Sequence, residues 1–186
     1  PEQQPLKLEG VVDRVLFFNA TNGYIVLELE TEQSIETVVG ELGEIEDGET
    51  LLVMGQYISH SKFGMQFRAE YCERKLPSTA ENIRKYLSSG VISGIGPSLA
   101  KRIVDVFGDK TLEIMEQHPE QLASIKGISQ KKCQEIAREV QKIFTLRSLM
   151  TYLSQYRIPA CYAMKAFQQW GVKSRDVIDS NPYSLC

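Results

Sequence analysis

The stretch VISGIGPSLAKRIV, residues 91–104, lies between two segments whose apolar residues recur with the period of a helix. Gly94 and Gly96 permit a tight turn and leave backbone N–H groups uncovered, and Ile95 between them can bury between the helices. Pro97 suits the first position of a helix. The sequence therefore predicts a hairpin of two helices whose exposed amides, together with a helix N-terminus, can hold phosphate oxygens.

This pattern resembles the helix-hairpin-helix motif, which grips the sugar-phosphate backbone of DNA without reading bases. Two cationic residues one turn into the second helix strengthen the resemblance, because they can neutralise a phosphate. A single glycine turn between helices can also be a plain connector, so one copy leaves that alternative open. The candidate DNA-binding residues of this first bend are Gly94, Ile95, Gly96, Ser98, Lys101 and Arg102.

A second copy of the bend follows at IKGIS, residues 125–129, where Gly127 falls on Gly94. The small and apolar positions match, since Cys133 falls on Ala100. Glu135 stands where Arg102 did, which weakens the phosphate grip of this copy, and nearby lysines can compensate. The candidate residues of the second bend are Lys126, Gly127, Ser129, Lys131 and Lys132.

A longer repeat duplicates the hairpin pair as a whole, and it places Gly171 on Gly108. The third bend, residues 157–159, has lost both glycines, so we expect it to keep the packing and lose the amide cradle. On this register the counterpart of Gly127 is position 190, four residues past the last one. The sequence thus predicts a chain cut before its own fourth hairpin.

Residues 6–74 are rich in Val, Ile, Leu, Phe and Tyr, in short runs that turn signals interrupt. With no helical segment to cover a face, five antiparallel strands bury their apolar sides best by closing into a small barrel. An oligonucleotide-binding (OB) type of barrel is the leading candidate, although a related small barrel would leave the same pattern. The strands are expected near residues 8–18, 24–30, 35–42, 50–57 and 65–72.

The fold class that follows is α+β in two parts. A small antiparallel OB-like β-barrel occupies residues 1–76, and an all-α domain of tandem helix-hairpin-helix repeats occupies residues 77–186. Ser78 as N-cap and Glu81 three residues later predict the start of the first helix.

Charge divides the chain in the same way. The net charge of the 186 residues is −3, but residues 1–77 carry 6 Lys and Arg against 14 Asp and Glu, whereas residues 78–186 carry 15 against 10. A polyanion is therefore expected to meet the second half first.

Several kinds of chemistry lack their sequence signatures. No GxxxxGK[ST] phosphate loop occurs, and the four cysteines and two histidines form no ligand cluster. We therefore expect no catalytic residues and no metal-binding residues in this sequence. The acidic run at 41–49 is interpreted as a solvated loop. No apolar run is long enough to cross a membrane. Most aromatic residues of the barrel are expected in its core, while Phe63, at a hairpin tip, is the candidate for stacking on a base.

The order of short motifs resembles the amino-terminal region of RecD-like DNA helicases, the relatives of the exodeoxyribonuclease V alpha subunit. The motifs that carry it are LEGVV at 8–12, NGY at 22–24, GQY through HSKFGMQF at 55–67, GIGP at 94–97 and NPYSL at 181–185.

This resemblance implies a bacterial, cytoplasmic parent protein of DNA repair or recombination, which moves 5′ to 3′ along single-stranded DNA. Its motor domains, with ATP and Mg²⁺, would lie beyond residue 186, so this part is expected to hold no cofactor. The expected partners are single-stranded or forked DNA, the motor domains and a protein partner on the barrel.

Two other functions are compatible with these residues. A Holliday-junction scaffold also joins such a barrel to paired hairpins, but the longer duplication speaks against it. A protein-docking module with degenerate hairpins is the other, since one bend has lost its glycines.

Overall fold

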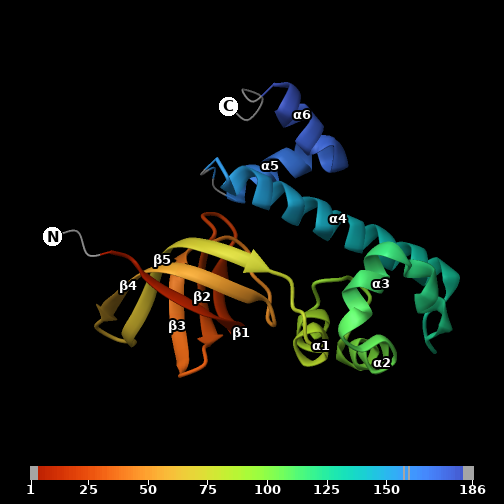
Figure 1. Ribbon diagram of the computed structural model, residues 1–186, viewed down its shortest axis with the longest axis horizontal. Coiled ribbons are helices and arrows are strands. Elements are labelled where there is room, and N and C mark those ends of the chain that lie inside the picture. Colours follow the sequence, from red (N-terminus) through yellow and green to blue (C-terminus); the bar gives the residue numbers. More distant parts are fainter. Residues whose placement is uncertain (1–3, 157, 159, 182–186) are drawn as a thin grey trace. The chain divides into compact units, whose positions relative to one another are not determined.

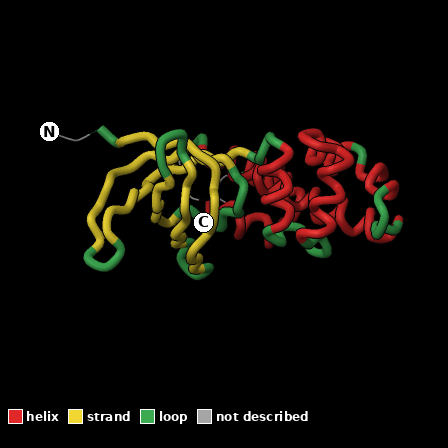
Figure 2. Tube along the Cα trace, turned by 90° about the horizontal axis from the view of Figure 1, so that it is seen from below, coloured by secondary structure: helices red, strands yellow, loops and turns green. Residues whose placement is uncertain are grey.

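The computed structural model describes residues 4–156, 158 and 160–181, except for the side chains of residues 154, 160–164 and 172. The chain divides into two compact units, Pro1–Thr111 and Leu112–Cys186 (Figure 1). The last strand ends at Lys75 and the first helix begins at Ala80. Figure 2 shows the strands in yellow and the helices in red. The first unit thus contains the barrel and the first bend, and the second unit contains the second bend.

Five strands form a closed barrel in the order β1-β2-β3-β5-β4. All neighbouring strands run antiparallel except β3 and β5, which pair in parallel at Val38 with Phe67. The expected barrel is confirmed, but the prediction that all its strands pair antiparallel is wrong at this closure. Because successive strands reverse direction, β3 and β5 run the same way and can pair only in parallel. The strands are β1 (Leu6–Asn19), β2 (Tyr24–Glu30), β3 (Ile35–Glu41), β4 (Thr50–His60) and β5 (Gly64–Lys75).

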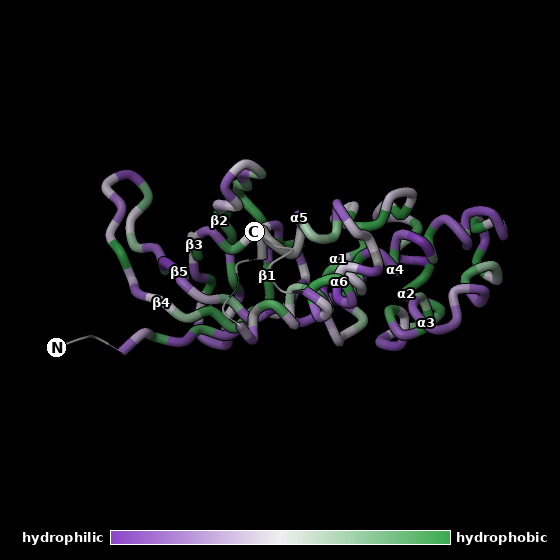
Figure 3. The backbone as a smooth tube through the Cα atoms, turned by 90° about the horizontal axis from the view of Figure 1, so that it is seen from above, coloured by the Kyte–Doolittle hydropathy of each residue, from purple (hydrophilic) through white to green (hydrophobic). Residues whose placement is uncertain are grey.

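Alternate residues of the strands fill the barrel, as the period-2 pattern requires. Figure 3 shows hydrophobic positions in green and hydrophilic positions in purple along the strands. Leu42 and Ile45, from the connection between β3 and β4, are also buried in this core. Backbones cross closely at Gly55, where an added Cβ would collide with the Arg68 carbonyl oxygen. The strand residues of the core are Val12, Ile25, Leu27, Leu29, Val38, Leu51, Val53, Phe67 and Ala69.

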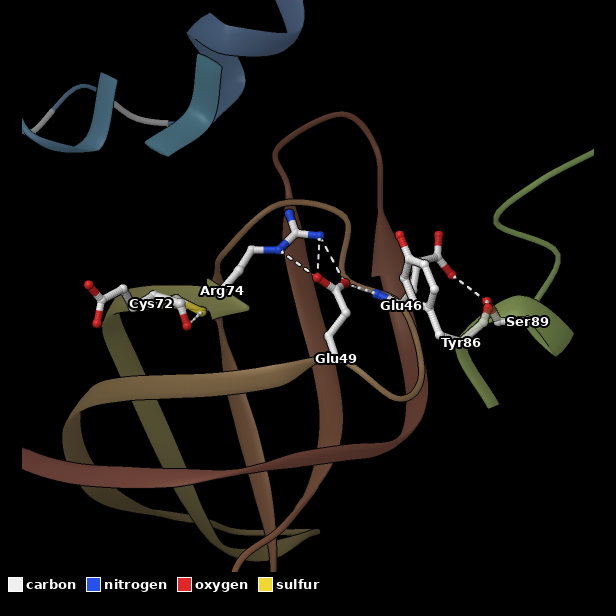
Figure 4. A network of polar contacts seen from close by, with 7 residues as sticks. Glu46, Glu49, Cys72, Arg74, Tyr86 and Ser89 are labelled. Atoms are coloured by element: carbon white, nitrogen blue, oxygen red, sulfur yellow. Dashed lines mark hydrogen bonds and ion pairs between the residues drawn. The ribbon is translucent and has the colours of Figure 1, made fainter. Parts of the chain in front are cut away.

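A buried ion pair fixes the connection between β3 and β4 (Figure 4). The Glu49 side chain is fully buried and accepts a hydrogen bond from Arg74 Nη2 at 2.9 Å. The same carboxylate accepts the Glu46 backbone N–H at 2.6 Å. A buried carboxylate needs such partners, because burying it unpaired is costly. The acidic run is thus partly a structural element of the barrel rather than wholly a solvated loop.

The first helix is attached to the barrel within the first unit. Lys85 Nζ lies 2.6 Å from Asp13 Oδ1. The Ser89 hydroxyl donates to Glu46 Oε2 at 3.2 Å, as Figure 4 shows. At Gly48, whose φ is +87°, an added Cβ would lie 2.6 Å from the Asn82 carbonyl oxygen. These contacts fix the start of the first hairpin relative to the barrel.

The helices of the first unit are α1 (Ala80–Ser88) and α2 (Pro97–Phe107), followed by a 3₁₀ turn, η1 (Gly108–Lys110). The N-cap of α1 is Thr79, whose hydroxyl accepts from the Asn82 N–H at 3.2 Å. The prediction of a Ser78 cap is therefore wrong by one residue.

After the first unit the chain is helical, as expected, and one cluster of its apolar residues gathers around Leu149, Leu153, Ala166 and Ile178. Among the residues described, no helix combines the length and the apolar character that a membrane crossing requires. The elements are α3 (Thr111–Gln117), η2 (Pro119–Ser124), α4 (Gln130–Ser154), α5 (Ala160–Trp170), η3 (Gly171–Lys173) and α6 (Ser174–Ser180).

The longer duplication, which places Gly171 on Gly108, is confirmed by the backbone. Gly108 and Gly171 have φ values of 56° and 59°, and each opens a three-residue 3₁₀ turn. The next residues, Thr111 and Ser174, are both buried, and each donates its hydroxyl hydrogen to the carbonyl of that glycine. The repeated unit therefore shares its hydrogen bonds as well as its apolar pattern.

Candidate nucleic-acid interface

The first bend has the geometry that its sequence predicts. Gly94 has a φ of 88°, in the left-handed region that favours glycine. The Ile95 N–H donates to the Ile92 carbonyl at 3.2 Å, and the Ala100 N–H donates to the Gly96 carbonyl at 2.9 Å. The Ile95 side chain is 2% exposed, whereas Gly94 and Gly96 are exposed. The apolar residue thus anchors the bend and both glycines face solvent.

The N-terminus of α2 is open. Gly96 is its N-cap, and among the described residues no side chain caps this end. The first amides of a helix have no intrahelical acceptor, so those of Ser98 and Leu99 depend on an outside partner. Gly96 has a φ of −96°, and an added Cβ there would meet nothing within 4 Å. Neither the backbone nor the packing requires glycine at this position, which instead leaves the amides uncovered for a close approach.

The second bend repeats these hydrogen bonds in the same register. The Ile128 N–H donates to the Ile125 carbonyl at 3.1 Å, and the Cys133 N–H donates to the Ser129 carbonyl at 2.9 Å. Gly127 has a φ of 99°, and it is exposed. The repeat inferred from the sequence is thus confirmed in the backbone.

The two bends differ at the helix cap. The Ser129 hydroxyl accepts the Lys132 N–H at 3.2 Å, so the capping residue of α4 already satisfies one amide of that helix. Serine is among the favoured N-cap residues, and Ser129 serves as one here.

The cationic residues of both bends lie at the surface. Lys101 is exposed and forms an ion pair with Asp105, with Nζ 2.8 Å from Oδ2. Sequence reasoning missed this partner, although the i,i+4 spacing on a helix could have revealed it. Ser98, Arg102, Lys126 and Lys131 are exposed, and Lys132 is half-buried.

The predicted stacking residue lies at the turn between β4 and β5. Phe63 is 63% exposed, and its ring centroid lies 5.3 Å from Lys62 Nζ and 4.9 Å from that of the His60 ring. An exposed aromatic beside a cation suits both a base and a phosphate.

The third bend lies only partly within the described residues. Arg157 and Pro159 fall outside them, and Ile158 packs against the apolar cluster of the second unit.

No group of three or more potential metal ligands occurs among the described residues.

Comparison with known proteins matches both parts of the chain. Residues 5–77 match the family model described as the OB-fold domain of the ATP-dependent DNA helicase YrrC. Residues 83–142 match the model of a SAM-like helix-hairpin-helix tandem.

A curated relative spans both parts. The ATP-dependent RecD2 DNA helicase of Deinococcus radiodurans is 23% identical to this chain in an alignment of 190 residues, gaps included. The alignment covers 98% of the chain. The chain spans about a quarter of the length of that relative, 26%. The barrel domain, the hairpin tandem and the order in which they follow each other are therefore similar to a region of RecD-like DNA helicases.

Proposed function

We propose that this chain is the non-catalytic DNA-binding portion of an ATP-dependent helicase that moves 5′ to 3′ along DNA. In this proposal the chain holds backbone phosphates through its helix-hairpin-helix bends and does not read the sequence. Motor domains outside residues 1–186 would bind ATP and Mg²⁺. The match to a RecD2 helicase over 98% of the chain supports this function over a junction scaffold.

The observation that carries the proposal is the open first bend. Exposed Gly94 and Gly96 flank a buried isoleucine, and the glycine at position 96 has no role that its own φ or packing explains. Amides at a helix N-terminus attract anions, because the helix dipole adds to their partial positive charge. A phosphate oxygen can approach these amides where a Cβ would obstruct it.

Positively charged residues follow each of the two bends along the chain. Lys101 and Arg102 follow the open amides on α2, and Lys131 and Lys132 follow the second bend on α4. Each neutralised phosphate releases condensed counterions, so affinity should fall steeply with salt. Two such contacts suit a strand at a fork or duplex end, and Phe63 would stack on an unpaired base.

The test is a salt titration of the binding of residues 1–186 to fluorescein-labelled forked DNA of two unrelated sequences. We expect a Kd of roughly 10⁻⁴ to 10⁻⁶ M at physiological salt, equal for both sequences, and a linear fall of log affinity with log salt. A flat salt dependence, or a strong preference for one sequence, would refute the proposal. A tetramer in solution would favour the junction scaffold instead.

A further inference from the structure

One face of α4 carries a polar stripe near its C-terminal end. Ser148, Thr151, Tyr152 and Gln155 stand at i, i+3, i+4 and i+7, which places them on one side of a helix. With Arg175 from α6 they line a pocket of about 280 Å³. All five residues belong to the second compact unit.

Contacts around Tyr152 hold Arg175 in place. The Tyr152 ring packs against the apolar cluster of the second unit, and its hydroxyl donates to Asp179. This hydrogen bond raises the pKa of Tyr152 to about 12. The Arg175 Cζ lies 4.8 Å from the ring centroid, and Arg175 Nε lies 3.9 Å from Asp179 Oδ2. The guanidinium is thus stacked and oriented before any ligand arrives.

The lining is suited to an anion. Besides the Tyr152 hydroxyl, whose hydrogen bonds to Asp179, it offers a guanidinium, two aliphatic hydroxyls and an amide, and Asp179 is not among its five lining residues. The contact with Asp179 involves Nε, whereas the terminal nitrogens of a guanidinium carry four further N–H donors. A planar guanidinium can bind two oxygens of a phosphate at once, and an ordered side chain loses less entropy on binding.

We propose that this pocket is an anion site that takes a phosphoryl group, either from a DNA strand or from a free phosphate compound. The site has no counterpart in the first copy of the longer repeat, where Ser89 and Leu112 occupy the positions of Tyr152 and Arg175. The third hairpin, whose bend has lost its glycines, would thus contribute through side chains.

The test is a titration of the ¹⁵N-labelled chain with inorganic phosphate, followed by NMR at the Arg175 side-chain Nε–H and the backbone amides of residues 148–155. We expect saturable shifts at both sets of signals. Arg175→Gln should abolish the shifts of the backbone amides, whereas Lys173→Gln, an equal charge change at an exposed site, should leave them in place. Gln155→Glu should weaken phosphate binding at least about tenfold by repulsion, whereas the matched Gln141→Glu should not. Absence of saturable shifts in the wild-type chain, or unchanged shifts in both pocket variants, would overturn the proposal.

A second arm identifies the source of the phosphate. If DNA supplies it, Arg175→Gln should lower the slope of log affinity against log salt by about one. An unchanged slope, with phosphate shifts still present, assigns the pocket to a free phosphate compound. This readout separates the pocket from the proposed DNA grip, because shifts from inorganic phosphate do not require the bends to bind DNA.

Discussion

The two bends share a backbone and differ in what they offer a ligand. Gly94 and Gly127 adopt the same left-handed conformation, and the same two hydrogen bonds recur around each of them. At the next position of the motif the first bend has Gly96 and an open helix end, whereas the second has Ser129 and a side-chain cap. The comparison teaches that the fold of such a bend and its ability to hold an anion depend on different residues.

The surroundings of the bends differ as well. The helix before the first bend is attached to the barrel through Lys85, Gly48 and Ser89. The helix after the second bend, α4, continues for 25 residues and packs against α5. We therefore expect the first bend to be the stronger and the more firmly positioned phosphate contact.

Charge reversal should have the largest effect. Lys101→Glu with Arg102→Glu should weaken DNA binding on the order of a hundredfold at low salt, because two phosphate contacts become repulsive. The matched double substitution, Lys131→Glu with Lys132→Glu, should weaken DNA binding less, on the order of tenfold. Fluorescence anisotropy with forked DNA measures both, and equal losses would contradict the ranking of the bends.

A β-branched residue at the left-handed glycines should destabilise both bends alike. Gly94→Val and Gly127→Val should each lower the free energy of unfolding by about 1 to 3 kcal/mol, because valine is strained at positive φ. Urea denaturation followed by circular dichroism measures this loss. Gly96→Val is the control, since its φ of −96° and open surroundings tolerate a side chain. A comparable loss in the control would show that position 96 has a structural role after all.

Exchanging the caps should exchange the properties of the bends. Gly96→Ser should add a cap that occupies the Leu99 amide, and should lower DNA affinity about fivefold while leaving stability unchanged or raised by a few tenths of a kcal/mol. Ser129→Gly should cost a similarly small amount of stability and increase affinity. The test is to measure the DNA affinity and the free energy of unfolding of both variants. Parallel changes in both quantities would mean that the cap acts only through folding.

Asp105 should restrain the first bend through its ion pair with Lys101. Asp105→Asn should raise DNA affinity about twofold to threefold at low salt, since exposed ion pairs of this kind are worth little. Asp109→Asn removes an equal charge from the exposed residue that follows Gly108. An equal gain in the two variants would reduce the effect to net charge.

The smallest effect concerns pH and the attachment of α1. Burial raises the pKa of Glu46 above its usual 4.5, so the folded chain binds this proton more tightly than the unfolded chain. The resulting stabilisation is fully present below 4.5 and is lost as pH rises through the raised value. Glu46→Gln should therefore gain stability over the wild type at pH 7, and this gain should shrink at pH 4. Hydrogen exchange of the α1 amides measures it, and a pH-independent difference would refute the role of Glu46.

Local patterns in the sequence predicted most of the fold. The strand-forming composition of residues 24–30 after a turn predicted β2 to the residue, and the glycines at 94 and 127 predicted both bends, because local preferences decide such features. The parallel contact of Val38 with Phe67 depends on which strands close the barrel, and no local pattern encodes it. Thr79 displaced Ser78 as a cap because either residue type can fill that position.

The local structure of the two bends could also be predicted from the sequence. The exposed glycines, the buried isoleucines and the uncovered amides of the first bend followed from the motif, whereas the ion pair between Lys101 and Asp105 was missed. The pocket around Arg175 was missed, since it joins residues of α4 and α6 through tertiary packing.

The length of α4 sets the distance between its two ends. Its 25 residues span about 37 Å, at about 1.5 Å per residue. The N-terminal end of α4 follows the second bend, and its C-terminal end contributes residues to the pocket around Arg175. A single ligand that contacted both would therefore have to span nearly the whole length of this helix.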